Sequence, residues 1–247
     1  MSDCNNVADK LVLSKANDTI ALADKRFSPC YFGFLNEHEA QLIKDKIYLT
    51  EDMMFWGGYD NAQRVIFGAN VSDTKAFPIK ALSFTYKREY KLTHRDFLGS
   101  LMALGIERST IGDIVVSDGK TIVFVKDDIC EYILREVTKI GRVGVKIEVL
   151  DIIDIECNND IEELSFTVSS LRLDVFVSAV CHLSREKSQQ FIKSDMVSLN
   201  YNIENNISRN IKEDDVITIR KYGKFIFTES VGFSKKGRIK IKVNRFR

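Results

Sequence analysis

Alternating and helical patterns of apolar residues predict a regular series of elements in the middle of the chain. Two helical stripes, at 93–104 and 127–139, are interleaved with strand-like runs at 79–86, 113–116, 121–125 and 143–149. Thr93 is placed to cap the first helix, and Asp118-Gly119 favours a hairpin turn between the second and third strands. The predicted order is β-α-β-β-α-β, a ferredoxin-like arrangement over residues 76–150.

The preceding segment, residues 1–75, is predicted to be a mixed α/β region. Val7 to Lys25 has a helical pattern, and Asn36 followed by acidic residues predicts a second helix that ends near Ile47. Gly57-Gly58 indicates a turn, and the pattern leaves Asn61–Ile66 unassigned.

The C-terminal segment, residues 168–247, is predicted to hold two short helices followed by short strands at 197–200, 216–220, 224–227 and 238–243. The first helix has a buried face that includes Leu173 and Phe176, and Ser184 caps the second. In the second helix Ser188, Phe191 and Ile192 are expected inside, with Gln189, Gln190 and Lys193 facing away. The predicted fold class of the whole chain is α+β.

Between these segments, residues 148–164 carry seven acidic residues and no basic one. Two interpretations of 151–167 have equal weight: an acidic linker, or a solvated edge strand.

The near-neutral total charge of +1 hides a strong polarisation. Residues 171–247 hold 16 Lys and Arg against 8 Asp and Glu, whereas residues 1–170 hold 20 against 27. A basic surface of this kind is typical of a nucleic-acid binder.

Other function classes lack their signatures in this sequence. No apolar run is long enough to span a membrane, no signal peptide is expected, and the five scattered cysteines indicate free thiols in a reducing cytoplasm. The spacing of the histidines predicts no metal site, and no cofactor motif or catalytic residue is expected. His94-Arg95-Asp96 spells a kinase triplet, but Leu101 stands where a kinase needs Asn.

Several C-terminal positions resemble the small RNA-binding module named after ribosomal protein S four, or alpha-L motif. They are Arg172-Leu173-Asp174, Ser184-Arg185, Ile192, Val197-x-Leu199-Asn200 and Asp215-x-Ile217-x-Ile219-Arg220. Asp195-Met196 and Asp214 replace glycines of the family pattern, and both turns remain feasible because Asp tolerates positive φ better than most residues.

The middle of the chain is similar to the YlmH family of bacterial RNA-binding proteins. The resemblance rests on Thr93–Ile106, Ile111–Ile114 and Phe55–Tyr59. It implies a cytoplasmic, non-enzymatic protein whose partner is the large ribosomal subunit carrying peptidyl-tRNA, with a role in rescuing stalled nascent chains. A link of the family to cell division is also implied, and a monomer is expected.

The candidate RNA-binding residues are polar or basic side chains of the C-terminal segment: Arg172, Ser184, Arg185, Lys187, Lys193, Asn200, Arg220, Lys221 and Lys224. Arg172 and Asp174 could instead form a plain surface salt bridge. The run Ser234–Arg238 is a turn that serves either phosphate contact or solubility.

A secondary RNA contact is a hypothesis for four basic residues of the central domain, interleaved with Tyr86 and Tyr90: Lys87, Arg88, Lys91 and Arg95. The favoured alternative is a charged loop whose aromatic side chains pack into the core.

Two further function hypotheses stay open. One is an RNA-modifying enzyme of the pseudouridine synthase or methyltransferase type, with its catalytic domain within residues 1–150. The other is a protein-interaction scaffold that uses the acidic N-terminal half.

Overall fold

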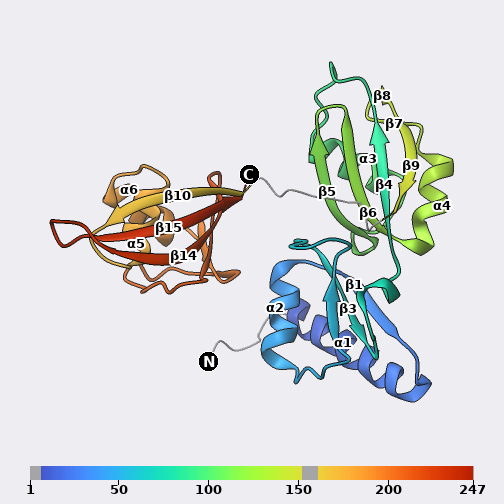
Figure 1. Ribbon diagram of the computed structural model, residues 1–247, viewed down its shortest axis with the longest axis horizontal. Coiled ribbons are helices and arrows are strands. Elements are labelled where there is room, and N and C mark those ends of the chain that lie inside the picture. Colours follow the sequence, from blue (N-terminus) through green and yellow to red (C-terminus); the bar gives the residue numbers. More distant parts are fainter. Residues whose placement is uncertain (1–6, 152–160, 247) are drawn as a thin grey trace. The chain divides into compact units, whose positions relative to one another are not determined.

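The computed structural model describes residues 7–151 and 161–246, and the chain forms two compact units, residues 1–157 and 158–247 (Figure 1). The predicted α+β class is confirmed, since helices and antiparallel sheets occur in both units.

The N-terminal part of the first unit is a three-stranded antiparallel sheet with two helices. In chain order its elements are α1 (Val7–Arg26), β1 (Cys30–Leu35), α2 (Glu37–Lys46), β2 (Met54–Trp56) and β3 (Val65–Ala69). The strand order is β1-β3-β2, so the central strand β3 begins inside the stretch that the sequence left unassigned. Both helices match their predicted extents closely.

Asn36 caps α2 as the sequence predicted. Its Oδ1 accepts a hydrogen bond from the backbone N–H of Glu39 at 2.9 Å, and Oε2 of Glu39 accepts the N–H of Asn36 at 2.7 Å. The two residues thereby satisfy each other's backbone donors at the helix start.

The central part follows the predicted order of elements. It consists of β4 (Ile79–Thr85), α3 (His94–Ala103), β5 (Ile111–Ser117), β6 (Lys120–Lys126), α4 (Asp127–Glu136) and β9 (Lys146–Leu150), with short strands β7 (Lys139–Ile140) and β8 (Val143–Gly144) before β9. The antiparallel sheet has the order β5-β6-β4-β9. Gly119 has φ +77° in the predicted hairpin turn, and α4 ends three residues earlier than predicted.

One face of this central sheet packs against its two helices. Phe97 of α3 and Ile133 of α4 form a buried cluster with Leu82, Phe84 and Val123 of the sheet. The residues that alternate with these strand positions point to the opposite face.

The opposite face of the central sheet packs against the N-terminal part. Ala81 and Phe124 share a buried cluster with Phe34, Tyr59 and Ile66, and the rings of Tyr59 and Phe124 stack with centroids 4.8 Å apart. The predicted boundary near residue 75 therefore separates two segments of one compact unit.

Asp113 at the start of β5 ties the same two parts together by hydrogen bonds. Its carboxylate accepts from the Tyr59 hydroxyl at 2.8 Å, the Gln63 N–H at 2.7 Å and the Arg64 N–H at 3.1 Å. Gly58, with φ +101°, leaves room for the ring of Phe124, since a Cβ there would lie 2.5 Å from Cδ1 of that ring.

The second unit is a six-stranded antiparallel sheet with two helices on one face. Its elements are β10 (Ile161–Val168), α5 (Leu173–Val180), α6 (Arg185–Lys193), β11 (Val197–Leu199), β12 (Asn202–Ile203), β13 (Val216–Ile219), β14 (Gly223–Phe233) and β15 (Ile239–Phe246). The strand order is β10-β15-β14-β13-β11-β12. The helices cover the face that carries Ile217, Phe225, Phe227, Ile241 and Val243.

Two extents differ from the sequence prediction. Residues 161–168, left open between a linker and an edge strand, form the edge strand β10 along the whole of β15. The strands β14 and β15 are longer than predicted and form one long hairpin. Residues 152–160 of the acidic segment lie outside the described residues.

The two departures from the alpha-L pattern occupy turns of the expected kind. Asp195 has φ +56° and Asp214 has φ +67°, so both adopt the left-handed region in which the family has glycine. Within the described part of the chain, no helix is long and apolar enough to cross a membrane.

We expect Asp113→Ala to destabilise the first unit by about 2–4 kcal/mol, because it removes a charged acceptor from three donors. The free energy of unfolding in urea, followed by the fluorescence of the single tryptophan, Trp56, measures this change. The control is Asp118→Ala, whose exposed pair with Lys91 at 3.0 Å contributes about 0–1 kcal/mol. Equal stability of the two variants would contradict the role of Asp113.

Candidate nucleic-acid interface

The centre of the candidate interface is the buried carboxylate of Asp174, in the first turn of α5. Its side chain is 0% exposed, and it accepts four hydrogen bonds. Arg172 donates from Nε at 3.0 Å and Nη2 at 3.2 Å, Arg185 donates from Nε at 3.1 Å, and Gln189 donates from Nε2 at 3.1 Å. We call these four residues the Asp174 cluster.

The main chain around Asp174 fixes the helices that carry the cluster. The hydroxyl of Ser188 in α6 donates to the carbonyl of Asp174 at 2.9 Å and is fully buried. The N–H groups of Leu173 and Asp174 donate to the carbonyls of Arg209 and Ile207. Two backbone N–H groups in the first turn of α5 thus find acceptors in a distant loop, as the donors of a buried helix start require.

The charge of Asp174 is maintained by its donors. Burial alone raises the pKa of this carboxyl, but hydrogen bonds from Arg172, Gln189 and Arg185 outweigh burial and lower its pKa to about 2. Asp174 is therefore ionised at neutral pH, and its two arginines are held in fixed positions by a charged partner.

Both arginines of the cluster still reach solvent. The side chain of Arg172 is 31% exposed and that of Arg185 is 61% exposed. The hypothesis of a plain surface salt bridge between Arg172 and Asp174 is wrong in one respect, since the carboxylate is buried and shared by two arginines. The cluster carries two positive charges against one negative charge.

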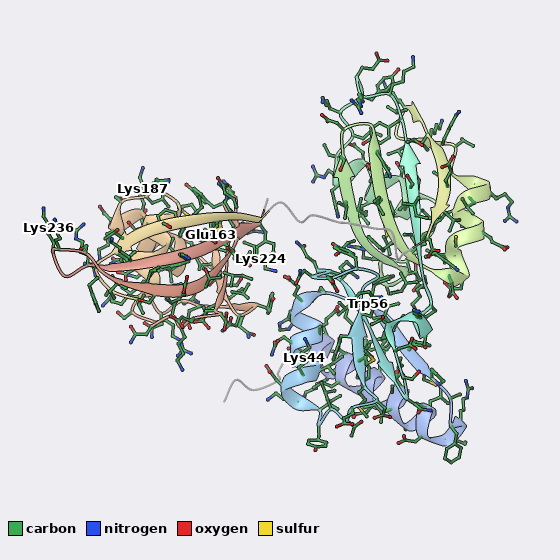
Figure 2. All side chains as sticks on the ribbon, in the orientation of Figure 1. Lys44, Trp56, Glu163, Lys187, Lys224 and Lys236 are labelled. Atoms are coloured by element: carbon green, nitrogen blue, oxygen red, sulfur yellow. The ribbon has the colours of Figure 1, made fainter. Side chains whose placement is uncertain are left out.

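Ser184 and Lys187 lie at the start of α6, beside the cluster. Ser184 caps α6 as predicted, and its Oγ accepts the N–H of Lys187 at 3.3 Å, so this hydroxyl serves the helix. Lys187 is exposed, and Figure 2 labels it at α6.

A second group of predicted residues lies at the other end of α6. Lys193 is in the last turn of α6, and Phe191 contacts the ring of Tyr222 with centroids 5.8 Å apart. Arg220 and Lys221 directly precede this tyrosine in the turn from β13 to β14, and both are exposed. We call Arg220 and Lys221 the turn pair. This turn contacts α6 through Tyr222 and Phe191, whereas the Asp174 cluster includes Arg185 and Gln189 of the same helix.

Lys224 and Asn200 have structural contacts. The Nζ of Lys224 lies 4.6 Å from the centroid of the Phe246 ring. Asn200, at φ +47°, accepts the N–H of Val216 at 2.9 Å and donates to Asp215 at 2.8 Å. Its amide organises a turn.

The hypothesis of a secondary contact in the central part receives mixed support. Lys87 pairs with Glu89 at 3.8 Å and Lys91 pairs with Asp118 at 3.0 Å, while Arg88 and Arg95 are exposed. The ring of Tyr86 packs beside Phe97, and its hydroxyl shares a hydrogen bond with the hydroxyl of Thr121, as the alternative of a core role predicted. Tyr90, in contrast, is 44% exposed.

The sheet face of the central part does not offer its central aromatic ring to a base. Phe124 is 0% exposed and stacks on Tyr59 of the N-terminal part. A ring on a sheet can stack on an RNA base only if its face is exposed. The face of Phe124 is covered by Tyr59, so this ring is not available to a base.

The sequence interpretation missed Gln189, which was expected to point away from the buried side of α6. It lies four residues after Arg185, so the two side chains share a helix face. That spacing is the signal that could have grouped Gln189 with Arg185.

The geometry defines a class of protein: an α+β chain whose second unit is small and basic and holds two partly exposed arginines in fixed positions. Residues 73–154 match the family described as "Putative RNA-binding domain in YlmH". Over 199 residues the chain is 31% identical to the Bacillus subtilis (strain 168) protein named ribosome-associated protein quality control protein P2, covering 78% of this chain and 77% of that protein. The chain belongs to the YlmH family.

A solved structure has a similar fold. The structure titled cell division protein ylmH from Streptococcus pneumoniae matches with a TM-score of 0.51 and 22% identity, over 62% of this chain and 98% of that one.

We expect the Asp174 cluster to make the second unit sensitive to acid. Because the folded pKa of about 2 lies below the ordinary value of 3.8 for an aspartate, ionised Asp174 contributes stability above pH 4 that is lost as the pH falls through 2. The contribution is about 2 kcal/mol.

Asp174→Asn removes this pH dependence. The difference in free energy of unfolding between the wild type and the variant is expected to be about 3–5 kcal/mol at pH 7 and to shrink by about 2 kcal/mol at pH 2. Urea unfolding followed by circular dichroism measures it, with Trp56 fluorescence identifying the transition of the first unit. A difference that is constant from pH 7 to pH 2 would contradict the assigned pKa.

Proposed function

We propose that this chain is a non-enzymatic protein that binds structured RNA on the large ribosomal subunit, next to peptidyl-tRNA, in the quality control of stalled nascent chains. The observation that carries the proposal is the Asp174 cluster, which fixes two partly exposed arginines on a basic unit. The printed name of the Bacillus subtilis relative, a ribosome-associated quality control protein, supports the choice of partner.

The cluster suits phosphate recognition because its arginines are already positioned. The bonds to Asp174 use Nε and Nη2 of Arg172 and Nε of Arg185, which leaves other guanidinium donors for a ligand. A fixed, planar guanidinium binds phosphate with less loss of side-chain entropy than a free one. Contacts of this kind recognise the shape and backbone of an RNA helix rather than its base sequence.

The turn pair extends this surface along α6. Lys187 lies in the first half of α6 and Lys193 in its last turn, so basic side chains occur at both ends of the helix. Basic side chains spread over such a surface suit contact with several phosphates of an RNA strand. Contact of this kind needs no bond to be made or broken, which fits a binding protein.

We expect the double variant Arg172→Gln, Arg185→Gln to bind purified bacterial large ribosomal subunits about 10- to 100-fold more weakly at physiological salt. Glutamine keeps an N–H donor for Asp174, as Gln189 already provides, but removes the charge. The slope of log K against log salt should decrease by about 1–2, since fewer counterions are released.

The matched control is Lys25→Gln, Arg26→Gln, which removes the same charge from exposed positions at the end of α1. Arg185→Gln alone is a milder variant, and circular dichroism checks that each variant is folded. If a folded double variant sediments with subunits as the wild type does, the Asp174 cluster is not the RNA site.

The turn pair gives an independent test of a continuous surface. We expect Arg220→Gln, Lys221→Gln to weaken binding to the same subunits and to reduce the salt slope by up to about 2. Because the hydrogen bonds of Arg172 and Arg185 to Asp174 and that of Arg220 to Met196 have no partner in common, the effects of the two double variants on binding free energy should add within about 0.5 kcal/mol. If this double variant binds the subunits with unchanged affinity, the turn pair lies outside the interface, which is then limited to the Asp174 cluster and the start of α6.

A further inference from the structure

The loop that joins β14 to β15, residues 234–238, lies beyond the last paired residues of the sheet. The pairing of β14 with β13 ends at Ile226, and β10 ends at Val168, opposite Ile239. The loop beyond Phe233 and Ile239 is the end of the hairpin, and Figure 2 labels Lys236 there.

Hydrogen bonds within the loop give the hairpin end a defined shape. The N–H of Ser234 donates to the carbonyl of Arg238 at 2.7 Å, and the N–H of Gly237 donates to the carbonyl of Ser234 at 2.9 Å. The Oγ of Ser234 accepts the N–H of Arg238 at 3.1 Å, and Gly237 has φ +72°. The side chains of the loop are therefore carried on an ordered turn.

The hairpin end presents an aromatic ring among basic residues. Phe233 is 73% exposed and Val231 is 52% exposed. Four exposed basic residues accompany them: Lys235, Lys236, Arg238 and Lys240. From residue 230 to residue 247 the sequence holds seven basic residues and no acidic one.

Phe233 faces the side of the sheet on which the helices lie. It pairs with Ile239, whose side chain packs against the core beneath α5 and α6, and residues directly opposite on paired strands share a face. Arg172 follows Val168, the partner of Ile239, by four residues. The hairpin and the Asp174 cluster therefore lie on the same side of the second unit.

Hydrogen bonds of the loop before β13 also connect the hairpin with the segment that precedes the Asp174 cluster. Ser230 donates its N–H to Oε1 of Glu213 at 2.8 Å, and Ile211 donates its N–H to the carbonyl of Leu171 at 2.8 Å. Residues 211–213 thus contact both the base of the hairpin and the segment that leads into Arg172.

We propose that the β14–β15 hairpin is a second RNA contact, in which Phe233 stacks on an unpaired base and Lys235, Lys236 and Arg238 hold the flanking phosphates. This inference rests on the proposed function, because it names the kind of RNA that the second unit prefers. A single exposed apolar side chain is ordinary on protein surfaces. An exposed ring next to an ordered turn that carries several lysine and arginine side chains has the chemistry of single-stranded nucleic-acid binding.

The ligand that fits both contacts is an RNA stem interrupted by an unpaired nucleotide. The Asp174 cluster holds the backbone of the stem, and the ring of Phe233 receives the base that is not paired. A fully paired stem offers the first contact but hides its bases, so the hairpin adds a preference for the interrupted stem.

The test compares two fluorescein-labelled RNA stem-loops of the same sequence, one fully paired and one with a single bulged nucleotide, bound to the full chain. We expect the wild type to prefer the bulged RNA by about 5- to 150-fold, the range for stacking of one base. Phe233→Ala should lose this preference and keep its affinity for the paired stem, whereas Phe233→Trp should retain the preference.

Two further variants separate this inference from the proposed function. The double variant Arg172→Gln, Arg185→Gln should bind both RNAs more weakly by the same factor and keep the preference for the bulged RNA. Tyr48→Ala, which removes another exposed aromatic side chain, should change neither affinity. If Phe233→Ala keeps the preference, or the wild type has none, the hairpin contact is overturned while RNA binding by the Asp174 cluster stands. If the wild type binds neither these RNAs nor ribosomal subunits, the proposed function fails as well.

Discussion

The buried carboxylate of Asp174 is the interaction on which the arrangement of the second unit depends. An ionised carboxylate removed from water is very costly unless donors surround it. Arg172, Arg185 and Gln189 supply those donors from two different helices, and Ser188 binds the carbonyl of the same residue. The need to satisfy one buried charge therefore fixes α5 against α6 and, as a direct consequence, fixes two arginine side chains at the surface.

A different constraint shapes the first unit. Its central sheet is buried on both faces, since Phe84 packs toward the helices and Phe124 packs toward Tyr59. The face on which an RNA-binding sheet displays aromatic rings is used to join the N-terminal part. If residues 73–154, which match the putative RNA-binding domain, contact RNA, the exposed ring that the central part offers is Tyr90 in the loop 86–93 rather than Phe124 on the sheet.

Features that depend on neighbouring residues could be predicted from the sequence, and features that depend on distant partners could not. The caps at Asn36 and Ser184 and the positive φ of Asp195 and Asp214 are local, and the structure has all four. Gln189 was predicted to face away because its acceptor, Asp174, lies 15 residues earlier in the chain. The structure of residues 161–168 could not be decided from the sequence for the same reason. Their acidic pattern fits a linker as well as a strand, and they form the strand β10 by pairing with the distant β15.

For the attraction of a polyanion, the position of each charge in the second unit matters more than the net excess of basic residues. On the open face of the sheet, Lys242 lies 2.8 Å from Glu229 and 3.8 Å from Glu163, and the hydrogen bond with Glu229 raises the pKa of this lysine. The acidic residues of β10 and β14 thus neutralise part of that face. On the helix side, the only carboxylate of the Asp174 cluster is buried beneath two arginines, and the hairpin end is basic throughout. A polyanion that approaches this unit therefore meets basic side chains without acidic neighbours at the hairpin end, and basic side chains paired with Glu229 and Glu163 on the open sheet.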